Sequence, residues 1–309
     1  MHVTKRKDST VRESSNPILR GMTRGNQQPA GVPQQGYPQG YNQQGFNQAA
    51  GFGMGAAGAA QGMQYGQPQA PYETTTGGRT MTVDDVVTKT AATLGVLIVF
   101  AAASYFLVGA NPGLATPLTI VGAIGGLVLV LIGTFGRKMD NPAIVLSYAA
   151  FEGLFVGSIS YVFANWVIAD GINAGAFLSQ AILGTFGVFI GMLVVYKTGA
   201  IRVTPRFTRM MFGMLIGAMV LALGNLVIGL FSGGAGPLRD GSTLAIIFSL
   251  VMIGIAAFSF LLDFDQADQL IRAGAPAKAA WGVAFGLTIT LVWLYVEILR
   301  LLSYFYSND

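Results

Sequence analysis

Seven apolar stretches, each close to the length of a membrane-spanning helix, occupy most of residues 91–305. A helix needs about 20 predominantly apolar residues to cross the hydrocarbon core of a bilayer. Because lipid offers backbone groups no hydrogen-bond partners, such segments cross as helices. The chain is therefore predicted to be an all-α polytopic membrane protein with a seven-helix transmembrane bundle. We place the spans at roughly 91–109, 117–135, 143–166, 176–196, 210–231, 243–262 and 281–305.

The first 80 residues have a different composition. Asn26–Pro71 consists largely of Gly, Gln, Pro, Tyr and Phe, without helical or strand periodicity. Such a segment buries too little apolar surface to offset the entropy of ordering. We therefore predict a disordered cytoplasmic tail over residues 1–80 and a seven-span domain over residues 81–309. Thr82, followed by acidic residues, is suited to cap a helical lead-in over Met81–Lys89.

Basic residues alternate between the two sides of the predicted membrane. Lys and Arg are frequent in the tail up to Lys89 and in the loops after the second, fourth and sixth spans. In the other loops, Arg239 is the one basic residue. The positive-inside rule then places the N-terminus in the cytoplasm and the C-terminus outside. The expected location is the plasma membrane. The basic loop residues are Arg137, Lys138, Lys197, Arg202, Arg206, Arg209, Arg272 and Lys278.

Several classes of function are excluded by residues that the chain lacks. The sequence has no cysteine, and its only histidine is His2 in the tail. Thiolate chemistry and membrane-embedded histidine sites are therefore excluded. We expect no enzymatic activity, no cofactor and no nucleic-acid partner, because membrane orientation already explains the basic residues. The lipid bilayer is the expected environment.

Four carboxylates fall in or beside the apolar spans. Glu152 lies in the third span, Glu297 lies in the seventh, and Asp263 and Asp265 directly follow the sixth. A charged side chain at the bilayer centre costs about 2.5–3.5 kcal/mol, so such residues by default mark an ion or proton site. A rise of ~1.5 Å per residue puts Glu152 and Glu297 at similar depth. The two aspartates are expected near the inner end of the sixth helix.

Close carboxylates have a defined chemistry. Two close carboxylates share one proton, which raises the pKa of one of them. Once both are ionised, they offer hard oxygen ligands to Ca²⁺. Structural roles compete with this interpretation. Arg300 lies three residues after Glu297 and is placed to form an ion pair on the same helix. Glu152 could be protonated and bonded to a neighbouring helix, and the aspartates could be solvated at the interface.

Five spans carry glycines four residues apart, which lets another helix backbone approach closely. We expect these glycines to serve packing within the chain rather than dimerisation. The pairs are Gly122 with Gly126, Gly153 with Gly157, Gly187 with Gly191, Gly213 with Gly217, and Gly282 with Gly286.

The order of the motifs resembles the Bax inhibitor-1 family of membrane proteins, and most closely its bacterial branch with an extended N-terminus. The segments that carry the resemblance are Ser14–Arg20, Asn141–Ala143, Tyr148–Leu154, Asp263–Asp265, Gly274–Pro276 and Trp293–Leu302. The resemblance implies seven helices, with the last surrounded by the other six. It also implies a pH-sensitive calcium leak governed by an acidic pair between helices six and seven.

Carried over by position, the acidic pair is Glu297 with either Asp263 or Asp265. Glu297 departs from the aspartate usual in the wider family. The leading hypothesis is a cation leak gated by these acids together with Glu152 and Arg300, with Asp263 and Glu297 holding Ca²⁺ in transit. On this hypothesis the protein binds Ca²⁺ or H⁺. The alternative is a non-transporting membrane regulator that binds membrane proteases or other membrane proteins.

Overall fold

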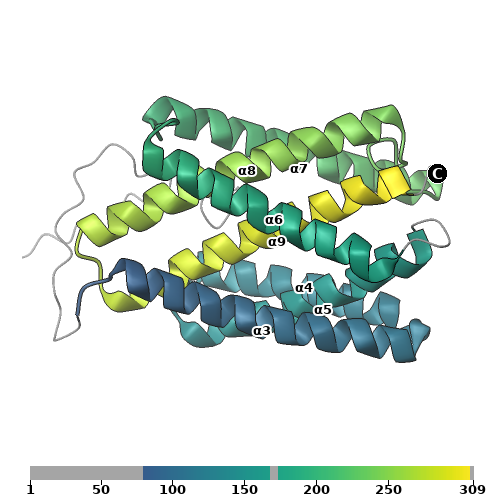
Figure 1. Cartoon of the computed structure of the whole chain (residues 1–309), viewed down its shortest axis with the longest axis horizontal. Coiled ribbons are helices and arrows are strands. Elements are labelled where there is room, and N and C mark those ends of the chain that lie inside the picture. The colour runs from purple at the N-terminus through teal and green to yellow at the C-terminus, as the bar shows by residue number, and fades with distance from the viewer. Residues whose placement is uncertain (1–78, 168–172, 307–309) are drawn as a thin grey trace, which may run out of the picture. The chain divides into compact units, whose positions relative to one another are not determined.

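The computed structural model describes residues 79–167 and 173–306. The predicted tail lies outside this range apart from Arg79 and Thr80, and so does the segment Ser14–Arg20. Within the described residues, seven helices are long and apolar enough to cross a membrane, which confirms the predicted all-α bundle (Figure 1). They are α3 (Val83–Ala110), α4 (Ala115–Phe135), α5 (Pro142–Val162), α6 (Ala174–Thr198), α7 (Pro205–Ser232), α8 (Thr243–Arg272) and α9 (Ala280–Tyr306).

The first helix begins before the apolar stretch from which it was predicted. α3 starts at Val83 rather than near residue 91, because Thr82 forms the predicted cap. The Thr82 hydroxyl accepts a hydrogen bond from the Asp85 amide, and the Asp85 carboxylate accepts one from the Thr82 amide at 3.1 Å. This reciprocal pair is a capping box, and it extends the helix through its polar first turns.

The sixth predicted span also continues further than expected. α8 ends at Arg272 rather than near residue 262, so Asp263 and Asp265 lie inside a helix and not at its end. Residues 263–272 contain neither Gly nor Pro, and their Gln, Ala, Leu and Ile side chains tolerate helix well. The helix stops just before Gly274, which adopts a positive φ of 67°.

α9 is the central helix of the bundle (Figure 1). It packs along α3, α5, α6 and α8, and it has the largest buried share of the seven helices. Phe285 and Leu294 are fully buried on it. α4 packs mainly on α5, and α7 packs mainly on α8. α9 therefore contributes more buried side chains than any other helix, in the central position that the family resemblance implied.

Two of the five glycine pairs bring helices into close contact. A Cβ on Gly153 would lie 2.5 Å from the Leu97 carbonyl oxygen of α3, and one on Gly157 would meet the Ala101 carbonyl oxygen. The first glycine of the α4 pair, Gly122, meets the α5 backbone in the same way. By contrast, the pairs on α6 and α7 have no atom near the position of a Cβ. The expected packing role therefore holds for the first half of the bundle.

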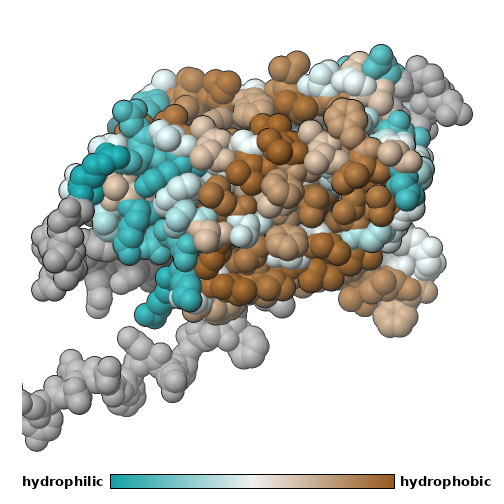
Figure 2. Space-filling model, turned by 90° about the horizontal axis from the view of Figure 1, so that it is seen from below, coloured by the Kyte–Doolittle hydropathy of each residue, from teal (hydrophilic) through white to brown (hydrophobic). Residues whose placement is uncertain are grey.

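The starts of α3 and α9 meet at one end of the bundle. The Met81 amide donates to the Ala275 carbonyl at 2.7 Å, and the Ala277 amide donates to the Arg79 carbonyl at 3.0 Å. The α4–α5, α6–α7 and α8–α9 connections lie at the same end (Figure 1), and all three carry basic residues. We call it the basic end. Figure 2 shows hydrophilic residues gathered there, beside a broad hydrophobic band.

Candidate carboxylate site

Glu297 is buried in the bundle and paired with an arginine from a loop. Its side chain is 3% exposed. The Arg239 guanidinium donates two parallel hydrogen bonds to it, from Nη1 to Oε2 at 3.0 Å and from Nη2 to Oε1 at 2.9 Å. This two-pronged geometry is the strong form of an arginine–carboxylate pair. Arg239 lies in the α7–α8 connection, at the end of the bundle opposite the basic end.

A second arginine completes the cluster. Arg300 Nη1 donates to Glu297 Oε1 at 3.1 Å, which confirms the expected ion pair three residues apart on one helix. Two guanidinium groups therefore face one carboxylate, and the formal charge of the cluster is positive. Both arginine side chains are mostly buried, at 18% exposed for Arg239 and 21% for Arg300.

Asn225 of α7 fixes the loop that carries Arg239. Its Nδ2 donates to the Ala235 carbonyl at 2.9 Å, and its Oδ1 accepts from the Leu238 amide at 2.8 Å. The Arg239 guanidinium also lies over the ring of Phe248 on α8, 5.3 Å from its centroid. These contacts hold Arg239 inside the bundle, where a cation–π contact adds to the ion pair.

Sequence reasoning found Glu297 and Arg300 but missed Arg239. A signal for it was present, because Arg239 is the one basic residue in the loops that are otherwise bare of Lys and Arg. A basic residue on the side disfavoured by the positive-inside rule needs a separate reason. The structure provides that reason in the buried carboxylate of Glu297.

Asp263 of α8 faces the central helix at a different level. Its Oδ2 accepts a hydrogen bond from the Thr290 hydroxyl of α9 at 2.7 Å. Its other oxygen, Oδ1, lies 3.5 Å from the position of a Cβ on Gly286, so the second glycine of the α9 pair makes room for the carboxylate. Asp263 is therefore held between two helices by a single hydroxyl donor.

The structure does not bring Asp263 and Glu297 together, although the sequence predicted their pairing. Thr290, the partner of Asp263, precedes Glu297 by seven residues on α9, which corresponds to about 10 Å along the axis. The oxygens of Glu297 bind Arg239 and Arg300 instead. The shared-proton pair is thus not formed in this structure. Sequence alone did not fix the relative register of α8 and α9.

Asp265, the rival candidate, lies on another side of α8. Two residues rotate a helix by about 200°, so Asp265 points away from the side that Asp263 occupies. Gln269 Nε2 donates to its Oδ2 at 2.7 Å. Nearby, Asp268 pairs with Arg272 at 2.6 Å and accepts from the Tyr196 hydroxyl of α6 at 3.4 Å. This acidic group belongs to the α6–α8 contact near the basic end.

Glu152 lies between α4 and α5. Its Oε2 is 2.5 Å from the position of a Cβ on Gly126, so this glycine leaves space for the carboxylate. Tyr148, one turn earlier on α5, has its ring edge-on to Phe285 of α9, with centroids 4.8 Å apart. Tyr148 also interacts with Glu152 through its hydroxyl, which links this acid indirectly to the central helix.

The three carboxylates Glu152, Asp263 and Glu297 lie at two levels. Glu152 and the Asp263–Thr290 contact are each ten residues from a helix start at the basic end, or about 15 Å. Glu297 is about 10 Å further along α9. The predicted equal depth of Glu152 and Glu297 is therefore wrong, because α9 is 27 residues long and exceeds the thickness of the bilayer core.

The predicted calcium ligands do not form a cluster here. Among residues 79–167 and 173–306, no group of three or more His, Cys, Asp or Glu side chains is placed to hold a metal ion. Asp263 and Glu297, the predicted calcium ligands, lie at separate levels, and the oxygens of Glu297 are bonded to Arg239 and Arg300.

Seven apolar helices, with α9 at the centre and carboxylates between the helices, define an integral, multi-pass membrane protein. The model of the Bax inhibitor 1 like family matches residues 16–307, and the chain belongs to this family. No curated protein matches the chain.

Proposed function

We propose that this protein is a pH-sensitive cation leak of the plasma membrane, with Ca²⁺ as the permeant ion. The observation that carries the proposal is the placement of Asp263 at mid-depth, where its hydrogen-bond partner among the described residues is Thr290 of the central helix. An ionised carboxylate there offers hard oxygen ligands, which Ca²⁺ prefers. A structural acid at such depth would be expected to have a basic partner, as Glu297 has.

The cluster at Glu297 serves as the closed gate in this proposal. Arg239 and Arg300 give it a net positive charge, which repels an approaching cation in a medium of low dielectric constant. The guanidinium of Arg239 also occupies the carboxylate oxygens that a cation would use. Opening then requires Arg239 to leave, and its position on a loop allows this without breaking a helix.

In this proposal the protonation of Asp263 determines whether the path is open at the second level, the level of Asp263. A neutral Asp263 carboxyl offers a weak ligand and leaves the path closed. When pH rises and the proton leaves, the ionised carboxylate attracts a cation and is poorly tolerated without one. Flux is therefore expected to rise with pH.

The test is Ca²⁺ flux through purified protein in liposomes, measured across roughly pH 6–8, where coupled or buried carboxyls titrate. Asp263→Asn should lower the flux and flatten its pH dependence. Arg239→Gln should raise the flux at the upper end of this pH range, where Asp263 is ionised, because the gate loses its blocking cation. Asp265→Asn is the matched control on the same helix and should behave like the original protein. An unchanged pH profile in Asp263→Asn would refute the proposal.

One observation favours the alternative of a non-transporting regulator. The glycine pairs on α6 and α7 lie open on the surface, where they would let a helix of another membrane protein approach closely. This function needs the open faces but not the carboxylates. Absence of Ca²⁺ flux in the original protein, together with a cell phenotype that survives Asp263→Asn, would favour it.

A further inference from the structure

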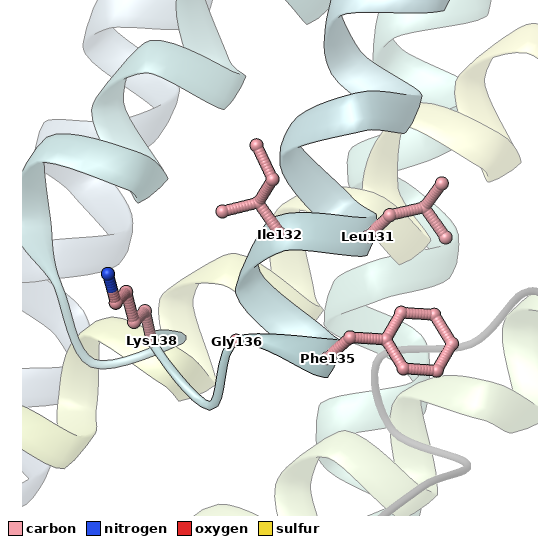
Figure 3. Close-up of a pocket in the computed structure, with 5 residues that line it drawn as sticks. All are labelled: Leu131, Ile132, Phe135, Gly136 and Lys138. Carbon is pink, nitrogen blue, oxygen red and sulfur yellow. The ribbon is translucent and has the colours of Figure 1, made fainter. Parts of the chain in front are cut away.

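The end of α4 forms a shallow groove with a basic residue at its edge. The groove has a volume of about 500 Å³ and is lined by Leu131, Ile132, Phe135, Gly136 and Lys138. Figure 3 shows the ammonium group of Lys138 directed toward the side of α4 that carries Ile132. An apolar wall below a cation is the arrangement that the headgroup and acyl chain of a lipid require.

The positive charges at this groove are not neutralised within the described part of the chain. Arg137 and Lys138 are both exposed, and neither forms an ion pair there. The nearest acid in sequence, Asp140, pairs with Lys278 at 2.8 Å instead. Lys138, which lines the groove, and its neighbour Arg137 thus place two exposed cations at this end of α4.

The turn after α4 holds an arginine where the backbone favours glycine. Arg137 has a φ of 51°, and within the described residues it is the one non-glycine residue with positive φ. The Lys138 amide donates to the Gly133 carbonyl at 3.0 Å, which is the bond that closes a helix in the Schellman motif. Glycine adopts this conformation more readily. The turn itself therefore does not call for an arginine, and the charge of Arg137 suits an anionic ligand in addition to the membrane orientation inferred from the basic loops.

A row of exposed apolar side chains extends the groove along α4. Ile124, Val128 and Ile132 recur every four residues on one side of the helix and are 57%, 44% and 45% exposed. From Ile124 to Gly136 the row measures about 18 Å, which is close to the thickness of one leaflet. An acyl chain beside this row would have its headgroup level with Lys138.

We propose that this groove binds one anionic phospholipid in the leaflet at the basic end. Its acyl chain lies along the Ile124–Ile132 row, and its headgroup phosphate contacts Lys138 and Arg137. The inference is independent of the flux proposal, because the groove shares no residue with the carboxylate site.

Native mass spectrometry of the full chain, titrated with phosphatidylglycerol or phosphatidylcholine of identical acyl chains, tests this proposal. The original protein should retain phosphatidylglycerol preferentially. Lys138→Gln should reduce that retention about fivefold, the effect of one lost cation at a membrane surface, and leave phosphatidylcholine unchanged. Arg137→Gly should act in the same direction, and because glycine suits the turn, the loss would not reflect a distorted backbone.

Two further variants separate a site from general surface charge. Lys197→Gln removes the same charge from the last turn of α6, outside this groove, and should leave both lipids unaffected. Ile132→Ser should weaken retention of both lipids by roughening the apolar row. Equal losses in Lys197→Gln and Lys138→Gln would overturn the proposal in favour of non-specific attraction. Equal retention of the two lipids by the original protein would also overturn it.

Discussion

At the scale of single residues, the bundle buries a charged cluster that is stable only as a whole. Glu297 satisfies two guanidinium groups, and removal from water costs each of the three ions several kcal/mol. Breaking a buried pair by removing one partner costs about 3–5 kcal/mol, since the remaining charge stays uncompensated. Replacing both partners with apolar side chains costs much less.

The first prediction follows from this asymmetry. Glu297→Met should lower the midpoint of thermal unfolding more than the double variant does, because it leaves two arginines facing each other in the bundle. The double variant Arg239→Met with Glu297→Met should recover much of the loss, since the remaining Arg300 is able to extend toward the surface. The midpoints are measured on purified protein in detergent. A double variant that is less stable than Glu297→Met would contradict the coupling of the two residues.

The second prediction concerns glycines that share a motif but differ in surroundings. Gly157→Ala should destabilise the protein by about 1–3 kcal/mol, because its Cβ would meet the Ala101 carbonyl of α3 and overpack the contact. Gly187→Ala should instead stabilise it by roughly 0.5–1 kcal/mol, because a Cβ there meets nothing and alanine favours helix. Thermal unfolding of the two variants should therefore shift in opposite directions.

At the scale of elements, the start of α3 and the α8–α9 loop form one unit. Thr82 caps α3, while its neighbours Arg79 and Met81 bond to Ala277 and Ala275. Lys89, about two turns further along α3, donates to the Ala277 carbonyl and lies over the ring of Trp281. Loss of the Thr82 cap should therefore destabilise both the start of α3 and the α8–α9 loop.

The third prediction tests this coupling by hydrogen exchange. Thr82→Ala should cost about 1 kcal/mol and speed exchange of the Asp85 amide, and also of the Ala277 amide, which bonds to Arg79. Thr204→Ala is the matched control, because the Thr204 hydroxyl also caps a helix, accepting from the Phe207 amide of α7, but within the described residues it bonds to no other loop. It should affect only the first turn of α7. Unchanged exchange at Ala277 in Thr82→Ala would show that the two segments act separately.

Sequence patterns predicted the elements well and the contacts between them poorly. The apolar runs gave all seven helices, because length and composition alone decide which segments cross a bilayer. The start of α3 depends on a capping box, and the end of α8 depends on a polar stretch without Gly or Pro. A hydropathy pattern detects neither feature. The partner of Asp263 depended on how α8 and α9 align, and that alignment follows from packing along their whole lengths.

At the scale of the whole molecule, the remaining question is the direction in which the bundle crosses the membrane. Seven spans place the two ends of the chain on opposite sides, and the basic residues gather at the end where α3 starts. The positive-inside rule predicts that this end is cytoplasmic. Arg239, the one basic residue of the opposing loops, does not weaken this inference, because it is buried against Glu297.

The last prediction is therefore that the N-terminus is cytoplasmic and the C-terminus is outside. A reporter enzyme active only outside the cytoplasm should be inactive when inserted near Gly25 and active when fused after Asp309. The same reporter after Ala200, in the basic loop between α6 and α7, is the internal control and should be inactive. Activity at both Gly25 and Asp309 would require an even number of crossings. Because the seven helices are all long enough to span, that result would mean that one of them lies in the membrane without crossing it.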